Sequence, residues 1–270
     1  MVIHPLDSTD NKLLRQLRRL LQSRSERAKR GLTVLEGPRL VESALAAGTP
    51  IHTVLYSPRL VEHQRGRELL ERMTRTRAKV VYVTDRVLSQ FSELETHQGI
   101  LAVAELATAH EPAWALPESR PGLFVVAQAV QDPGNLGTLI RAAQASGARG
   151  VGVTKGTVDL FNPKVIRATA GAIFSTRVHV LEDLWWQAAS QAGWQICGTR
   201  VAGGIPYHQY DWRRPVVLVV GNEGSGLEAG DWPREMDWVT IPMAPGANSL
   251  NVAMAATVLA FFARYARGEV

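Results

Sequence analysis

Three short segments in the second half of this 270-residue chain combine residue types that could do chemistry. Each brings glycine, asparagine or serine to a point where an apolar run ends and a helix is expected to begin, and they cover residues 135–141, 221–227 and 248–251. Backbone N–H groups are free at such junctions, and polar side chains from neighbouring loops can converge there. Three junctions of this kind predict one composite ligand-binding site.

Four polar side chains in these segments could serve that site. Asn135 follows the turn at residues 132–134, where it could also simply cap the next helix. Arg141 lies in an apolar stretch of that helix and needs either a salt-bridge partner or an open cleft. Glu223 is a carboxylate among glycines, a position with little structural need for charge. Asn251 is expected inside the first turn of the last helix, although asparagine is a poor helix former.

Several common kinds of site do not match the sequence. The glycines at residues 221–226 read G-x-x-G-x-G, whereas a dinucleotide site reads G-x-G-x-x-G, and no G-x-x-x-x-G-K-[ST] phosphate loop occurs. The single cysteine, Cys197, lies in an apolar stretch and predicts a buried thiol in a reducing compartment. Because no Cys/His spacing suits zinc or an iron–sulfur cluster, we expect no metal site.

The order of the polar segments resembles that of one enzyme family. The patterns N-x-G-x-x-x-R, V-G-N-E-G-S-G-L and I-P-M followed by S-L-N-V-A are similar to the three motifs of the SpoU branch of the SPOUT RNA methyltransferases; they occupy residues 135–141, 220–227, 241–243 and 249–253. The similarity covers roughly the whole second half. In the first half, residues 34–41 and 97–100 resemble that family's substrate-binding domain, which is similar to small RNA-binding ribosomal proteins.

The resemblance implies a reaction, a fold and an assembly. Such enzymes transfer a methyl group from S-adenosylmethionine to a ribose 2′-hydroxyl in RNA. Their catalytic domain is a parallel-sheet α/β domain with a deep trefoil knot, and they act as homodimers through that C-terminal domain. The expected cofactor-binding residues are Gly221, Leu227, Ile241, Met243 and Leu250. The expected catalytic residues are Asn135, Arg141, Glu223, Ser249 and Asn251.

The arginine of this cluster needs a role other than the one usually given to it. The family is described with this arginine as the base, but a guanidinium stays protonated in proteins. We therefore expect Arg141 to orient the ribose and its phosphate and to stabilise the emerging alkoxide. Glu223 and Asn135 are expected to hold one another, while Ser249 and Asn251 hydrogen-bond near the methionine part of the cofactor or the substrate.

The charge distribution favours a nucleic-acid partner. The net charge of +5 is concentrated in the first half, in basic segments at residues 1–30 and 59–79. One basic helix alone would more often be a solvated face, but two in the same half favour RNA. The expected RNA contacts come from the first basic segment and from stretches that carry the resemblance, and they are Arg27, Arg30, Arg39 and Arg167.

Hydrophobic periodicity predicts alternating helices and strands in both halves. In the first half we expect helices at 11–25, 38–47 and 60–74 and strands at 32–35, 52–56, 80–83 and within 97–103. In the second half we expect strands at 123–127, 150–153, 195–198, 216–220 and 238–241 and helices at 136–146, 184–192 and 250–265. Continuous apolar strands between helices predict a parallel α/β sheet.

A proline-rich stretch at residues 108–121 without periodicity is typical of a linker. The expected domains are therefore an RNA-binding domain at 1–107 and the methyltransferase domain at 122–270. The last helix is apolar almost all round, so it should be buried on more than one side, which favours an oligomer interface.

The sequence as a whole predicts a cytoplasmic 2′-O-ribose methyltransferase acting on ribosomal RNA of the large subunit. No signal peptide or membrane-spanning run is found, and we expect no membrane partner. The alternatives are a tRNA 2′-O-methyltransferase and a non-catalytic RNA-binding assembly factor. The intact polar cluster argues against the non-catalytic alternative.

Overall fold

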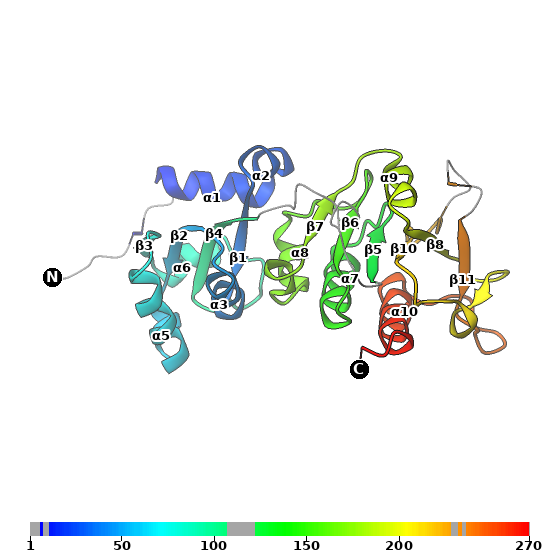
Figure 1. Cartoon of the computed structure of the whole chain (residues 1–270). Coiled ribbons are helices and arrows are strands. Elements are labelled where there is room, and N and C mark those ends of the chain that lie inside the picture. Colours follow the sequence, from blue (N-terminus) through cyan, green and yellow to red (C-terminus); the bar gives the residue numbers. More distant parts are fainter. Residues whose placement is uncertain (1–5, 8–10, 107–121, 228–231, 234–235, 270) are drawn as a thin grey trace. The chain divides into compact units, whose positions relative to one another are not determined.

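The computed structural model describes residues 6–7, 11–106, 122–227, 232–233 and 236–269 (Figure 1). The expected linker at 108–121 lies outside the described residues. Contacts divide the chain into two units: Met1–Ala107 with Asp159–Phe174, and Thr108–Val158 with Ser175–Val270. Among the helices of the described residues, none has both the length and the apolar character needed to cross a bilayer.

The described part of the first unit contains a four-stranded sheet in the order β1-β4-β2-β3. The strands are β1 (Leu32–Glu36), β2 (Ile51–Tyr56), β3 (Lys79–Tyr82) and β4 (Ile100–Glu105). β4 runs antiparallel to β1 and β2, while β2 and β3 are parallel. The helices are α1 (Lys12–Gln22), α2 (Arg24–Arg30), α3 (Pro38–Ala46), α4 (Pro58–Val61), α5 (Gln64–Thr74), α6 (Asp85–Ser89) and α8 (Pro163–Ala168).

The first helix is divided where the sequence predicted one continuous helix. α1 buries Leu14, Leu17 and Leu20 in the core of this unit. Ser23 ends α1 and also caps α2, because its hydroxyl accepts a hydrogen bond from Glu26 N at 3.3 Å. An N-cap residue has extended backbone angles, so it interrupts the helix that precedes it.

The segment Asp159–Phe174 packs within the first unit through a buried ion pair. The Arg27 side chain is 5% exposed, and its Nε and Nη2 both lie 2.7 Å from Asp159 Oδ2. Arg27 Nη1 also donates to the carbonyls of Leu20 and Leu21, at 2.6 and 3.0 Å. Removal of one partner of such a pair costs about 3–5 kcal/mol, because the other charge is left buried.

The described residues of the second unit form a seven-stranded sheet in the order β7-β6-β5-β10-β8-β11-β9, with parallel pairing throughout. The predicted parallel α/β sheet is therefore confirmed. The strands are β5 (Leu123–Ala127), β6 (Gly150–Val153), β7 (Val178–Val180), β8 (Gln195–Thr199), β9 (Ile205–Pro206), β10 (Val216–Val220) and β11 (Asp237–Thr240). The helices are α7 (Pro133–Ala145), α9 (Trp185–Gln191) and α10 (Val252–Ala266). The knot implied by the resemblance stays a prediction.

Strand order brings distant segments together at one edge of this sheet. β5 and β10 are neighbours, and Val220 at the end of β10 pairs with Ala127 at the end of β5. The chain leaves β5 toward β6 on one side, while β10 is followed by β11 on the other. In parallel α/β sheets, ligands bind beside the carboxyl ends of strands at such a switch point.

The last helix packs through one face only within this unit. α10 lies beside α7 and buries Ala256, Leu259 and Ala263 (Figure 1). Its other face exposes large apolar side chains, namely Met254, Val258, Phe261 and Tyr265. The helix is therefore not buried on more than one side in the single chain.

Candidate functional site

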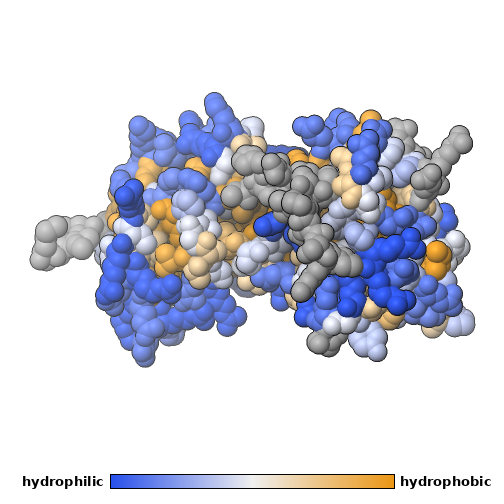
Figure 2. All heavy atoms as spheres, viewed as in Figure 1, coloured by the Kyte–Doolittle hydropathy of each residue, from blue (hydrophilic) through white to orange (hydrophobic). Residues whose placement is uncertain are grey.

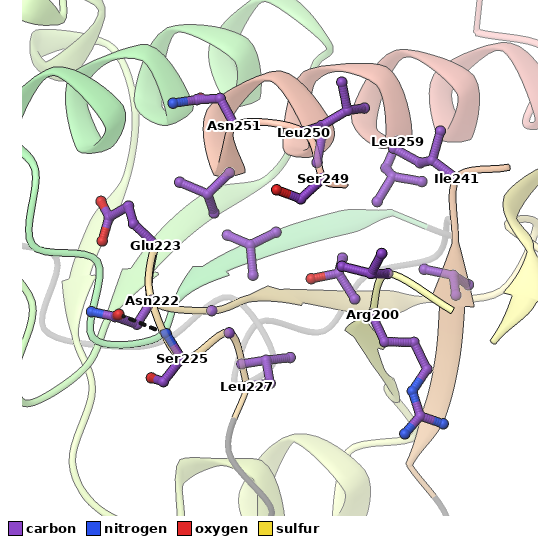
Figure 3. A pocket seen from close by; sticks show the side chains of 18 of the residues that line it. Arg200, Asn222, Glu223, Ser225, Leu227, Ile241, Ser249, Leu250, Asn251 and Leu259 are labelled. Carbon is purple, nitrogen blue, oxygen red and sulfur yellow. Dashed lines mark hydrogen bonds between the residues drawn. The ribbon is translucent and has the colours of Figure 1, made fainter. Parts of the chain in front are cut away.

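A cavity of about 630 Å³ opens at the carboxyl edge of the parallel sheet (Figure 3). Its walls come from the ends of β8, β10 and β11 and from the start of α10. All five residues expected to bind a cofactor line it: Gly221, Leu227, Ile241, Met243 and Leu250. Three of the expected catalytic residues line it as well, and they are Glu223, Ser249 and Asn251.

Hydrogen bonds connect the three sequence segments into one cluster. Asn251 Nδ2 donates to Asn135 Oδ1 at 2.8 Å, and Asn135 Nδ2 donates to Glu223 Oε1 at 3.0 Å. The carboxylate also accepts from the backbone N–H groups of Asp132, at 3.0 Å, and Gln131, at 3.1 Å. Asn135 thus lies at the centre, between the loop after β10 and the start of α10.

The helix starts differ from the sequence prediction in a way that explains this cluster. Asp132 caps α7 by accepting from Asn135 N at 2.7 Å, so the Asn135 side chain is free to bond Glu223. Asn251 is the N-cap of α10 and accepts from Ala253 N and Met254 N at 2.9 and 3.3 Å. Asn251 therefore precedes the first turn of α10. It occupies the N-cap position, at which asparagine is favoured.

The Glu223 carboxyl is held in its charged form. Partial burial opposes ionisation, but the hydrogen bonds from Asn135, Gln131 N and Asp132 N outweigh it and lower the pKa of Glu223 below its ordinary value of 4.5. The carboxylate is therefore ionised at neutral pH and acts as an acceptor for all three donors.

The glycine loop after β10 is closed on itself by Asn222. Asn222 and Gly226 exchange backbone hydrogen bonds of 2.9 Å, and Asn222 Oδ1 accepts from Gly224 N and Ser225 N at 2.8 and 3.2 Å. At Gly221 a Cβ atom would lie 2.2 Å from the backbone of Gly226. This close approach permits only glycine at residue 221.

Arg141 is exposed on α7 and is not among the residues that line the cavity. The sequence left two possibilities for this arginine, a salt-bridge partner or an open cleft. Among the described residues, Arg141 has no salt-bridge partner. Its guanidinium is therefore available to a ligand.

One wall of the cavity was not predicted from the sequence. Arg200 lines it opposite the glycine loop, and its guanidinium carbon lies 4.5 Å from the ring centroid of Trp238 (Figure 3). Arg200 directly follows β8, and Trp238 belongs to the neighbouring strand β11. Their positions at two predicted strands of the parallel sheet were the signal that could have identified them. Across the described residues, no three His, Cys, Asp or Glu side chains lie together as metal ligands would.

The four arginines expected to contact RNA have different surroundings. Arg27 is buried against Asp159, so its expected RNA contact is not supported by its position. Arg167 bonds Glu36 and Glu93 at 3.2 and 3.0 Å. Arg30 is exposed and paired with Glu26 at 3.2 Å, while Arg39 is exposed at the start of α3.

The fold and the cluster at the sheet edge define a ligand-binding α/β enzyme domain joined to a smaller α/β unit. The model of the SpoU rRNA Methylase family matches residues 122–261, and the MRM3-like substrate binding domain matches residues 11–102. The chain therefore belongs to the SpoU rRNA methylase family, and the resemblance inferred from the motifs is confirmed.

Two characterised relatives and one solved structure are similar over nearly the whole chain. The 23S rRNA (guanosine(2553)-2′-O)-methyltransferase RlmP of Bacillus subtilis is 32% identical and covers 96% of this chain and 98% of the relative. The 23S rRNA (uridine(2479)-2′-O)-methyltransferase of Streptomyces viridochromogenes is 32% identical, covering 93% and 88%. The AdoMet-bound rRNA methyltransferase from Sinorhizobium meliloti has a TM-score of 0.84 at 30% identity, covering 97% and 98%.

Proposed function

We propose that this chain is an S-adenosylmethionine-dependent methyltransferase that modifies a ribose 2′-hydroxyl in large-subunit ribosomal RNA. The observation that carries the proposal is the hydrogen-bonded cluster Asn251–Asn135–Glu223 beside the sheet-edge cavity of a SpoU family member. The two relatives named for 23S rRNA 2′-O-methylation support an rRNA substrate over tRNA.

The cavity suits the cofactor in size and chemistry. Its volume of about 630 Å³ lies within the usual range of small-molecule pockets, about 300–1,000 Å³. Leu227, Ile241 and Leu250 supply apolar surface for a flat ring, and Gly221 and Met243 complete the lining. When bound, S-adenosylmethionine supplies an electrophilic methyl group on a positively charged sulfur.

The polar residues would position the two reactants. Methyl transfer forms a bond between the ribose O2′ and the methyl carbon, breaks the C–S bond to leave the neutral thioether S-adenosylhomocysteine, and passes the hydroxyl proton to water. Asn135 and Glu223 hold the glycine loop, while Asn251, bonded to Asn135, and Ser249 present polar groups from the start of α10. The Arg141 guanidinium supplies positive charge and N–H donors, so it would orient the ribose and its phosphate and stabilise the developing alkoxide. Such positioning can supply much of the rate enhancement.

The proposal includes a homodimer that covers the free face of α10. Met254, Val258, Phe261 and Tyr265 recur at helical spacing and are 40–69% exposed, which is a large apolar stripe for a monomer surface. A second copy of the chain would bury this stripe. Sedimentation velocity should give the dimer mass at micromolar concentration, and a monomer would overturn this part of the proposal.

We also propose that the catalytic domain contains a deep trefoil knot, that the protein is cytoplasmic, and that its domains span residues 1–107 and 122–270. The family matches at 11–102 and 122–261 support these boundaries. A cytoplasmic location fits the proposed substrate, because ribosome assembly would supply large-subunit rRNA there. Limited proteolysis should cut first within 108–121, and a first cut inside either domain would contradict the boundaries.

Substitution of Arg141 tests the assigned chemistry. Calorimetry should show that Arg141→Ala binds S-adenosylmethionine as the wild type does, whereas its methyl transfer to rRNA is lost. Arg141→Lys should keep part of the activity because it keeps the charge. Loss of cofactor affinity in Arg141→Ala would contradict the role of Arg141. Failure of the wild-type protein to bind the cofactor would contradict the proposed function.

A further inference from the structure

The first unit has two basic surfaces, which differ in how many carboxylates lie among their Lys and Arg residues. One is α1–α2, residues 11–30, and the other is the α4–α5 region, residues 59–79. Figure 2 shows hydrophilic residues over much of both. Residues 11–30 hold eight Lys and Arg against one carboxylate, Glu26, whereas residues 59–79 hold seven against three. The excess of positive charge is therefore denser on α1–α2.

The basic side chains of α1 project away from the core. Lys12, Arg15 and Arg19 are exposed on the face opposite the buried leucines, and Arg24 continues the surface onto α2. None of these four has an ion-pair or hydrogen-bond partner for its side chain among the described residues. Arg15 and Arg19 are about one turn, or roughly 6 Å, apart along the helix axis. The charges thus form a row that protein carboxylates leave uncompensated.

Two contacts hold this surface in place. The Arg18 guanidinium carbon lies 5.3 Å from the ring centroid of Phe91, which is buried. At the other end, Arg27 of α2 pairs with the buried Asp159 and donates to the carbonyls of Leu20 and Leu21 at the end of α1. A preformed row of cations loses less entropy on binding than a flexible one.

Three of the seven cations of the α4–α5 region have a partner within the unit. Arg65 pairs with Glu42, and Arg75 pairs with Glu71. Arg67 Nη1 donates to the carbonyl of Val61 at 2.6 Å. These partners, together with the exposed carboxylates of Glu62 and Glu68, lower the positive field around the remaining cations of this surface.

We propose that the exposed face of α1–α2 is the surface on which the phosphate backbone of the substrate RNA docks. This inference rests on the proposed function for the identity of the RNA. Phosphate contacts of this kind position an RNA without reading its sequence, and they make binding strongly dependent on salt. Arg27 contributes by shaping the surface, and the free cations around it make the contacts.

Two matched variants test the proposal with in vitro transcribed 23S rRNA as the probe. The first removes four exposed, unpaired charges from α1–α2: Lys12→Gln, Arg15→Gln, Arg19→Gln and Arg24→Gln. The control removes four exposed charges without a side-chain partner among the described residues from the other surface: Arg59→Gln, Arg72→Gln, Arg77→Gln and Lys79→Gln. RNA affinity is measured by filter binding over a range of salt concentrations, and S-adenosylmethionine affinity by calorimetry.

The α1–α2 variant should bind the RNA at least about tenfold more weakly near physiological salt, and its log–log salt slope should fall by about three. The control should stay within about twofold of the wild type, and both variants should bind the cofactor normally. The proposal is overturned if the control loses as much affinity as the α1–α2 variant, or if the α1–α2 variant binds like the wild type. Wild-type protein that binds this RNA without methylating it would instead count against the proposed function.

Discussion

At the scale of single residues, Glu223 connects the parts of the site. Its two carboxylate oxygens accept from one side chain and two backbone N–H groups, all from residues 131–135. Hydrogen bonds to a charged acceptor contribute roughly 1.5–3 kcal/mol each. Glu223 therefore fixes the glycine loop of the cavity against the start of α7.

Glu223→Gln should weaken cofactor binding by roughly tenfold or more. The glutamine NH2 group would face the N–H groups of residues 131–135, which need an acceptor, so the glycine loop would lose its anchor. Calorimetry with S-adenosylmethionine measures the effect. Glu182→Gln is the matched control, since Glu182 is an exposed carboxylate of the same unit outside the cavity. Equal affinities for Glu223→Gln and the wild type would refute this account of the loop.

The lowered pKa of Glu223 sets the pH dependence. A carboxyl whose pKa is depressed in the folded protein stabilises it above the ordinary pKa, and that contribution is lost as pH falls through the depressed value. Cofactor affinity should thus decline through Glu223 only below pH 4.5, and Glu223→Gln should lack this acid decline. A Glu223-dependent decline near neutral pH would contradict the assignment.

At the scale of elements, the long apolar strands and helices of the second unit could be predicted from periodicity. β7 and β9 span three and two residues, which is too short for a periodic signal. The caps of α7 and α10 could not be predicted either. Whether Asp132 or Asn135 caps α7 depends on backbone angles and on Glu223, a partner 88 residues away.

The glycine loop gives the sharpest prediction for an element. Gly221→Ala would place its Cβ 2.2 Å from the backbone of Gly226, so the loop must open and cofactor affinity should be lost. At Gly224 the nearest atom to an added Cβ is Asn222 Oδ1 at 3.4 Å, an ordinary contact. Gly224→Ala should therefore bind nearly as the wild type does. Calorimetry measures the S-adenosylmethionine affinity of both variants. An equal loss of affinity in Gly221→Ala and Gly224→Ala would contradict this role of the close contact at Gly221.

At the scale of the whole molecule, the motifs predicted the family, but no sequence pattern showed which cations are structural. The first unit includes Asp159–Phe174 through contacts between residues about 130 positions apart, such as Arg27 with Asp159 and Thr33 Oγ1 with the Phe161 carbonyl at 2.8 Å. Such pairs leave no periodic signal. The sequence therefore could not predict that Arg27 and Arg167 pair with carboxylates of the first unit.

Product analysis can show which atom of which RNA the enzyme methylates. Purified protein is incubated with S-adenosylmethionine and unmodified large-subunit rRNA, and the RNA is then digested and its nucleosides are identified by mass spectrometry. We expect a ribose 2′-O-methylated nucleoside that is absent when Arg141→Ala replaces the wild type. A methyl group on a base, or transfer to tRNA but not to rRNA, would contradict it.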